Sequence, residues 1–199
     1  WVANLPPLAL RSWREMRFAL TVIAPPSAGA ETLERTWASL SSVVWVGEPP
    51  SLHLWLCAPF SSAAVATVGS WQRRWGAPFM LRTRLSTVVA PGVAAEAWLP
   101  TNKSAEPMAL VAAEAELSPA LGVFLKNARL MADATAERLL AIDFGPPPAS
   151  NDAIYDESAP SGALTGSCGA FYFADAWLEL RAFLSARPEI LTNHSWPEA

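Results

Sequence analysis

The sequence predicts an α/β fold, in which a mostly parallel sheet carries helices on both of its faces. Short apolar runs of four to seven residues are typical of strands that are buried on both faces. Longer segments, with apolar residues three and four positions apart, lie between these runs and are typical of helices that bury one stripe. This alternation indicates right-handed β-α-β units, and 199 residues are enough for one well-filled domain.

The predicted elements follow one another between residues 18 and 187. The strands are expected at 18–24, 52–57, 79–89, 108–112, 139–144 and 169–173. The helices are expected at 30–42, 61–75, 92–99, 119–138 and 174–187. Ser118 and Pro119 begin the fourth helix, as a capping hydroxyl and a proline at the first helical position. The sheet-facing residues predicted for the last helix are Trp177, Leu180, Phe183 and Leu184.

We expect three parts along the chain: an irregular N-terminal arm at 1–17, the α/β domain at 18–187 and a C-terminal tail at 188–199. Segment 145–166, which is rich in Pro, Ser and Gly, is predicted to be a loop inside the domain. The arm contains Trp1, Trp13 and three leucines among prolines. We therefore expect the arm to lie on a neighbouring protein rather than on its own core.

The composition restricts the classes of partner. Hydrophobic residues make up 52% of the chain and charged residues 16%, and the net charge is -4. A general nucleic-acid binder is basic, so nucleic acid is not an expected partner. No run approaches the roughly 18 apolar residues that cross a bilayer. Ten tryptophans are more than we expect one core to hold, so some are expected at an interface with other proteins; the alternative is that they are ordinary core residues.

Four arginines form a local exception to the acidic balance: Arg73, Arg74, Arg82 and Arg84. Arg82 and Arg84 alternate with Thr83, so they share one face of the predicted strand. Two interpretations are open. These arginines either contact a polyanion or form a solvated face that protects the edge of the sheet.

Glu114 and Glu116 are the candidate metal ligands. They follow the apolar run 108–111 and precede Ser118, so they stand at the carboxyl end of a predicted strand. Their spacing of two residues places both on one side if the backbone is still extended. Mg²⁺ and Mn²⁺ prefer hard oxygen ligands such as carboxylates. The alternative is a pair of solvated acids near the start of a helix, where they interact favourably with the helix dipole.

The remaining reactive residues form no signature. The chain has two histidines, His53 and His194, and no glycine-rich phosphate-binding motif. Cys57 and Cys168 are expected to be buried thiols. The carboxylates available as a general base are Asp143, Asp152, Asp156 and Asp175. Asp175 precedes the last predicted helix and is expected to be a cap or a first-turn acid there.

Three stretches of this chain resemble family-2-like, GT-A-fold glycosyltransferases of the plant and algal type. Segment 110–119, Leu-Val-Ala-Ala-Glu-Ala-Glu-Leu-Ser-Pro, is similar to that family's Leu-Glu-Asp-Asp-Leu-Glu-Val-Ser-Pro motif. Segment 166–177, Gly-Ser-Cys-Gly-Ala-Phe-Tyr-Phe-Ala-Asp-Ala-Trp, is similar to Cys-Ser-Trp-Gly-Ala-Val-Tyr-Phe-Pro-Glu-His-Trp. Segments 20–23 and 32–40 look like the family's first strand and helix. The resemblance implies a GT-A-like fold that holds a nucleotide sugar together with Mn²⁺ or Mg²⁺.

The chain departs from the family's pattern at three places that would meet the donor. Segment 112–114 is Ala-Ala-Glu where the family has three carboxylates, and the first strand ends in Ala-Pro-Pro-Ser at 24–27 instead of a Thr-x-Asn-Arg turn. The second strand ends at 56–59 in Leu-Cys-Ala-Pro, without an acidic residue.

We therefore expect a catalytically inactive glycosyltransferase-like domain that binds no cofactor and acts as a structural or scaffold subunit among other protein subunits. One alternative is an active, metal-dependent glycosyltransferase that uses Glu114 or Glu116 with a nucleotide-sugar donor. Another is a binding module that keeps the cleft without turnover. Asn102 and Asn193 stand in N-glycosylation sequons. Sequons often arise by chance, so they leave the compartment open, with an organelle or the secretory-pathway lumen compatible with them.

Overall fold

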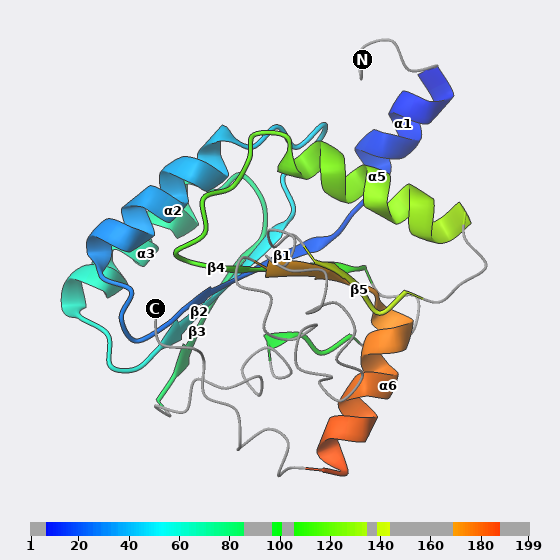
Figure 1. Ribbon diagram of the computed structural model, residues 1–199. Helices are drawn as coiled ribbons and strands as arrows, with labels where there is room; N and C mark the ends of the chain where they lie inside the picture. The colour runs from blue at the N-terminus through cyan, green and yellow to red at the C-terminus, as the bar shows by residue number, and fades with distance from the viewer. Residues whose placement is uncertain (1–6, 86–96, 101–105, 135–138, 144–168, 188–199) are drawn as a thin grey trace, which may run out of the picture.

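The computed structural model describes residues 7–85, 97–100, 106–134, 139–143 and 169–187, and a six-stranded sheet lies at its centre (Figure 1). The strands are β1 (Ala19–Ala24), β2 (Ser51–Cys57), β3 (Phe79–Arg84), β4 (Met108–Ala112), β5 (Ala141–Asp143) and β6 (Gly169–Tyr172). Their order is β3-β2-β1-β4-β6-β5, in which β6 runs antiparallel to both neighbours and all other neighbours are parallel. The predicted α/β fold with a mostly parallel sheet is confirmed.

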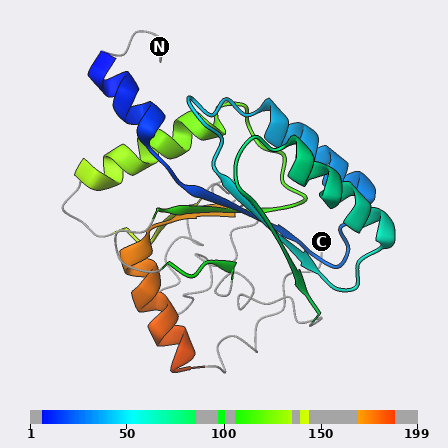
Figure 2. The ribbon, with the colours of Figure 1, turned by 180° about the vertical axis from the view of Figure 1, so that it is seen from behind.

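Helices cover both faces of this sheet, as Figures 1 and 2 show. They are α1 (Pro7–Glu15), α2 (Ala30–Ser42), α3 (Ser62–Arg74), α5 (Leu121–Ala134) and α6 (Ala174–Ser185). α2, α3 and α5 pack on one face, and α6 packs on the other. Most of the helix expected at 92–99 and the whole loop expected at 145–166 lie outside the described residues. Within the described part of the chain, no helix is long and apolar enough to span a bilayer.

The two faces of the sheet have separate hydrophobic cores, because side chains alternate along each strand. In β1, Leu20 and Val22 join the core under α2, α3 and α5, whereas Ala19 and Ile23 join the core under α6. Tyr172 lies on the α6 side. Strands β1, β4 and β6 are therefore buried on both faces, as their continuous apolar runs predict, whereas the edge strand β3 is partly exposed.

The tryptophans lie mainly in these cores and not at the surface. The buried ones are Trp13, Trp37, Trp55, Trp71, Trp75, Trp98 and Trp177, and Trp45 is partly buried. Seven of these eight are buried within their own domain, so the expected contact with a partner does not fall on them, whereas Trp45 remains partly exposed. All eight except Trp13 belong to one of the two cores. Within each core, tryptophan rings contact one another, with centroid separations of 5.3 Å for Trp37 and Trp71 and 5.8 Å for Trp98 and Trp177.

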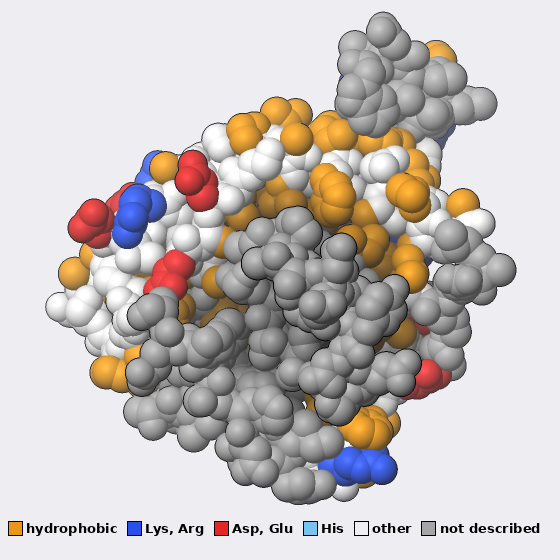
Figure 3. Space-filling model, in the orientation of Figure 1, with side chains coloured by type: hydrophobic (Ala, Val, Ile, Leu, Met, Phe, Trp, Pro, Cys, Tyr) orange, Lys and Arg blue, Asp and Glu red, His pale blue; other side chains and the backbone are white. Residues whose placement is uncertain are grey.

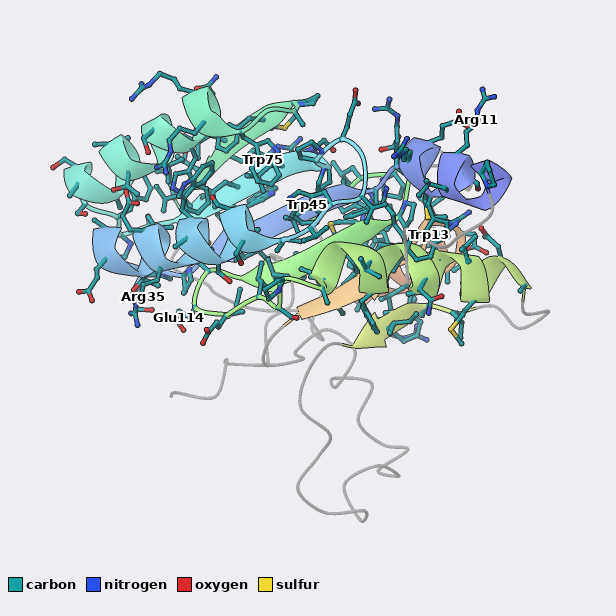
Figure 4. The ribbon with its side chains drawn as sticks, turned by 90° about the horizontal axis from the view of Figure 1, so that it is seen from above. Arg11, Trp13, Arg35, Trp45, Trp75 and Glu114 are labelled. Carbon is teal, nitrogen blue, oxygen red and sulfur yellow. The ribbon has the colours of Figure 1, made fainter. Side chains whose placement is uncertain are left out.

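The N-terminal arm is helical where it is described, so the prediction of an irregular arm is wrong for residues 7–15. α1 begins at Pro7, and proline is favoured at the first helical position because the donor it lacks would have no intrahelical partner. The helix contains no β-branched residue. Trp13 is 3% exposed, and its main-chain oxygen accepts a hydrogen bond from Lys126 on α5. This part of the arm packs on its own domain (Figure 4).

The last strand and helix agree with the sequence prediction except at one residue. Phe171 and Phe173 join one core while Tyr172 joins the other, and Trp177 is completely buried. Phe183, predicted to face the sheet, is 42% exposed and lies under the guanidinium of Arg187 at 4.1 Å. The apolar stripe of α6 is narrower than predicted, because residue 183 lies one step of about 100° around the helix from Leu184.

Candidate functional site at the carboxyl edge of the sheet

Because β1, β2 and β4 are parallel, their carboxyl ends meet at one edge of the sheet. Open α/β sheets bind ligands in the crevice outside this edge. Three segments leave the sheet there: 25–28 after β1, 58–60 after β2 and 113–117 after β4. Glu114 and Glu116, the predicted metal ligands, belong to the third segment. This edge is therefore the candidate site.

Ser27 and Glu114 meet at this edge from two different strands. The Ser27 hydroxyl donates a hydrogen bond to Oε1 of Glu114 at 3.3 Å, and both side chains are exposed. The main-chain amide of Ala113 donates to the Ile23 carbonyl at 2.9 Å, so the pairing of β4 with β1 continues one residue beyond the strand. That pairing holds Glu114 beside the segment that follows β1. Figure 4 shows Glu114 at this end of the sheet, next to α2.

Two hydroxyl groups of α2 hold the main chain of segment 113–117. Thr36 is buried and donates from Oγ1 to the carbonyl of Ala113. One turn further along, Ser39 accepts a hydrogen bond from the amide of Leu117 at 2.6 Å and donates to its carbonyl at 3.2 Å. Neither residue is among those predicted from the sequence. The signal was present, because a hydroxyl pair three positions apart stands beside the apolar stripe of this helix.

The chain turns directly after β4, and Glu114 lies within this turn. The amide of Ala115 donates to the carbonyl of Ala112 at 3.0 Å, which closes a turn. The backbone that carries Glu114 is therefore not extended. The prediction that Glu114 and Glu116 lie on one side required an extended backbone, so it does not apply here. The structure brings Glu114 to Ser27 and leaves Glu116 exposed. Across the described ranges, no three His, Cys, Asp or Glu side chains converge as a metal site would require.

The other predicted acids are distributed over the fold. Asp143 is the last residue of β5, an edge strand that β4 and β6 separate from β1. Asp175 lies in the first turn of α6, as predicted, where a carboxylate interacts favourably with the helix dipole. Asp152 and Asp156 lie outside the described residues, as do Cys168 and His194. Cys57 is buried at the end of β2, in agreement with its prediction as a buried thiol.

His53 lies in the middle of the sheet, in register with Thr21 of β1 and Met80 of β3. Its side chain is on the α6 side of β2, two residues before Trp55. Burial lowers the pKa of His53, and the nearby positive charge of Arg82 lowers that pKa further. The imidazole is therefore held neutral, in the interior of the sheet and away from Ser27 and Glu114.

The arginine cluster is used partly for packing. Arg82 and Arg84 share one side of β3, as predicted, with register partners Trp55 and Cys57. The guanidinium of Arg82 lies 5.3 Å from the ring centroid of Trp55. On α3, Arg74 lies 4.5 Å from the ring centroid of Trp37. Cation–π contacts with core tryptophans thus account for two of the four arginines.

Comparison with known proteins shows a likeness of fold but no match of sequence family. No protein-family model and no curated protein sequence matches this chain. Among solved structures, it is similar to the mannosyltransferase PcManGT from Pyrobaculum calidifontis, solved in complex with GDP-Man and Mn²⁺. The TM-score is 0.51 and the sequence identity is 16%, over 87% of this chain and 52% of that chain.

These values define the class of fold. The chain has a glycosyltransferase-like α/β fold of the GT-A type, which its family resemblance implies. It spans about half the length of the mannosyltransferase that it matches. At this identity the likeness concerns the fold, and the site must be judged on its own residues.

Proposed function

We propose that this chain is a catalytically inactive glycosyltransferase-like domain that serves as a structural subunit of a larger protein assembly. The observation that carries the proposal is the chemistry at the carboxyl end of β4. Ala112 and Ala113 present methyl groups, and the next residue, Glu114, has a carboxylate oxygen engaged by the Ser27 hydroxyl. A divalent cation with a nucleotide sugar needs several hard oxygen ligands at one point.

The segment around these residues also supports a structural role. Thr36 and Ser39 tie the main chain at 113 and 117 to α2, and a main-chain hydrogen bond closes the turn at 112–115. The hydroxyl groups of Thr36 and Ser39 thus bind the main chain of segment 113–117 and are not available to bind a nucleotide sugar. Pro25 and Pro26, which follow the first strand, lack backbone N–H groups and so offer no main-chain donor there.

Calorimetry with UDP- and GDP-sugars in the presence of Mn²⁺ tests the loss of donor binding. We expect no heat of binding beyond dilution. A dissociation constant of roughly micromolar strength, lost in Glu114→Ala and kept in Glu48→Ala, would contradict the proposal. Glu48 is an exposed glutamate that lies outside the site and so serves as the matched control.

The second candidate is an active, metal-dependent glycosyltransferase. It is favoured by the likeness to a mannosyltransferase solved with GDP-Man and Mn²⁺, and by the position of Glu114 at the donor-facing edge of the sheet. In this reading Glu114 or Glu116 would be a metal ligand. The calorimetric titration separates the two candidates, because an active enzyme must bind a donor.

The structural role has its own test in the native source. We expect the chain to purify within a stable complex of other protein subunits. Recovery of the chain only as a lone monomer under native conditions would contradict this part of the proposal, whatever the calorimetry shows.

A further inference from the structure

The edge strand β3 is open on one side. It stands at one end of the strand order and pairs with β2 alone (Figure 2). In the described part of the chain, no main-chain hydrogen bond joins its outer side to another segment. The opposite edge of the sheet is β5, which has three residues, whereas β3 has six. An exposed strand edge is a template on which a further strand can form.

The outward main-chain groups of β3 belong to Phe79, Leu81 and Thr83. The carbonyls of Pro78 and Arg84 accept hydrogen bonds of 2.9 and 2.8 Å from amides at the start of β2 and just after its end. Alternate residues of a strand direct their N–H and C=O groups to opposite sides, so the even-numbered residues face β2. The donors and acceptors of the odd-numbered residues therefore point away from the sheet.

The side chains of β3 are also more exposed than those of β1, β4 and β6, which are buried almost throughout. Leu81 is 40% exposed and Met80 is 41% exposed, and Leu85, which follows the strand, is 80% exposed. Figure 3 shows another group of hydrophobic side chains, over α5, but the main-chain groups of a helix bond to one another. β3 thus combines exposed apolar side chains with outward main-chain groups.

The charge of this part of the chain is opposite to that of the whole. Residues 49–95, which contain β2, α3 and β3, include four arginines and no acidic residue, although the chain has a net charge of -4. Arg82 lies over the ring of Trp55, and its Nε donates to the sulfur of Met80 at 3.2 Å. Among the described residues, no carboxylate forms an ion pair with Arg82. Charge complementarity therefore favours an acidic partner at this edge.

β3 presents different chemistry on its two sides. Leu81 is in register with Leu54, which belongs to the core under α2, α3 and α5. Arg82 is in register with Trp55, which belongs to the core under α6. The odd-numbered residues of β3, which are Phe, Leu and Thr, thus lie on the side of α3, and the even-numbered ones, which are Met, Arg and Arg, lie on the side of α6. Directly opposed residues of neighbouring strands share a side, so a complementary strand carries its acids on the side of α6 only.

We propose that β3 binds an extended acidic segment of a partner protein, which joins the sheet as an additional strand. In this segment, acidic residues alternate with apolar or β-branched residues, and the acids lie on the side of Arg82. Main-chain hydrogen bonds to residues 79, 81 and 83 supply affinity, and the alternation of side chains supplies specificity. The inference rests on the structural role proposed above, because it names a surface and a partner for that role.

A second copy of this chain is a poorer occupant of the edge. If two copies paired antiparallel through β3, their arginines would lie on the same side of the joined sheet. Arg82 and Arg84 of one copy would then approach those of the other, and like charges on facing strands are destabilising. An acidic segment places opposite charges there instead.

The contact is short, so we expect weak binding by an isolated peptide. Six residues span about 20 Å, and the contact stays below the roughly 800 Å² per partner of a standard stable interface. We expect a dissociation constant between roughly 10 μM and 1 mM. Within an assembly that is also held at other surfaces, the same segment binds more tightly, because its effective concentration is raised.

Fluorescence anisotropy with a short labelled peptide tests the proposal. The probe is a peptide in which valine alternates with glutamate, and its control is a peptide of the same length in which valine alternates with lysine. We expect the glutamate peptide to bind at least about tenfold more tightly than the lysine peptide. The proposal is overturned if the glutamate peptide does not bind at concentrations up to about 1 mM, or if the two peptides bind equally.

Two pairs of variants separate strand addition from a simple contact between charges. Thr83→Pro removes an outward N–H at a position where an edge strand tolerates proline, so the domain should fold and the peptide should bind at least about tenfold more weakly. Thr83→Val keeps the N–H and should bind as before. Arg82→Gln should weaken binding, and Arg82→Lys, which keeps the charge, should restore most of it. Leu81→Pro is a second test of the outward groups in case Thr83→Pro fails to fold.

The remaining outcomes also decide the question. Binding that survives in Thr83→Pro would assign the contact to charge alone and overturn the proposal. A dimer of the whole chain that Thr83→Pro dissociates would do the same, because a second copy would then occupy the edge. If neither proline variant folds, the two peptides and the two Arg82 variants still decide. A native complex that retains Thr83→Pro as firmly as the unmodified chain overturns this inference and leaves the structural role in place.

Discussion

Lys126 donates a hydrogen bond from its buried ammonium to the main-chain oxygen of Trp13, 113 residues earlier in the chain. A second hydrogen bond, of 2.8 Å, runs from the same Nζ to the carbonyl of Val46. The Lys126 side chain is 1% exposed, and burial lowers its pKa. One ammonium thus joins α1, α5 and the segment between α2 and β2.

Replacing this ammonium should destabilise the domain. Lys126→Met keeps the bulk of the side chain and leaves two buried carbonyls without their donor, which costs about 1–3 kcal/mol of the free energy of unfolding. Urea denaturation measures the change. The control is Arg73→Met, at an exposed position of α3, which should alter the free energy by no more than about 0.5 kcal/mol. An unchanged stability for Lys126→Met would mean that the cost of burying the charge cancels its hydrogen bonds.

Removing residues 1–16 should destabilise the domain as well, because α1 packs on it. The loss includes the burial of Trp13, about 1.5–3 kcal/mol for a large apolar side chain, and its hydrogen bond to Lys126. The midpoint of thermal unfolding should fall clearly. Removing only residues 1–6, which leaves α1 complete, serves as the comparison. Equal midpoints for the two truncations would show that α1 adds nothing to the fold.

His53 should make stability depend on pH below neutrality. Its pKa in the folded state lies below 6.5, the value for the unfolded chain, so the unfolded chain binds more protons in the window just below pH 6.5. The stabilisation is complete above pH 6.5 and is lost as the pH falls through that window, at up to about 1.4 kcal/mol per pH unit.

Urea titrations at several pH values between neutrality and mild acid measure this slope. His53→Gln should flatten it, while His194→Gln should not. A slope that survives the first variant would assign the effect to other groups.

Gly169 should tolerate no side chain. Its φ is +135°, and a Cβ there would lie 2.2 Å from the carbonyl oxygen of Leu110 on β4. Gly169→Ala must therefore move β6 away from β4, and we expect a loss of at least about 2 kcal/mol in the free energy of unfolding. The matched control is Gly69→Ala in α3, where nothing lies within 4 Å, so the change should stabilise by about 0.5–1 kcal/mol. Equal effects at the two glycines would contradict this account.

Local patterns predicted much of the fold correctly. The helix at 30–42 has the predicted bounds, and β1, β2, β4 and β6 begin or end within one residue of prediction. These elements depend on apolar periodicity, which is a property of neighbouring residues. The prediction of an irregular arm was wrong at residues 7–15, where Pro7 occupies the first position of a helix, as proline can.

The sequence predicted where the candidate site lies in the fold, but it did not predict which side chains contact one another there. The acids at 114 and 116 stand at the carboxyl end of a strand, as the sequence indicates. The turn that contains Glu114 is closed by the hydrogen bond from Ala115 to Ala112, and the partner of Glu114 is Ser27, 87 residues away. Neither relationship leaves a pattern in the residues next to the acids.

The sequence by itself determined the class of this protein's fold and the order of its elements, because burial on two faces requires continuous apolar strands between amphipathic helices. Only the tertiary structure decided which distant groups meet. Seven of the described tryptophans divide between two cores, and Lys126 donates to carbonyls that are 113 and 80 residues away. These contacts follow from how helices pack against a sheet, and the free energy of a buried polar group depends on the partners that this packing provides.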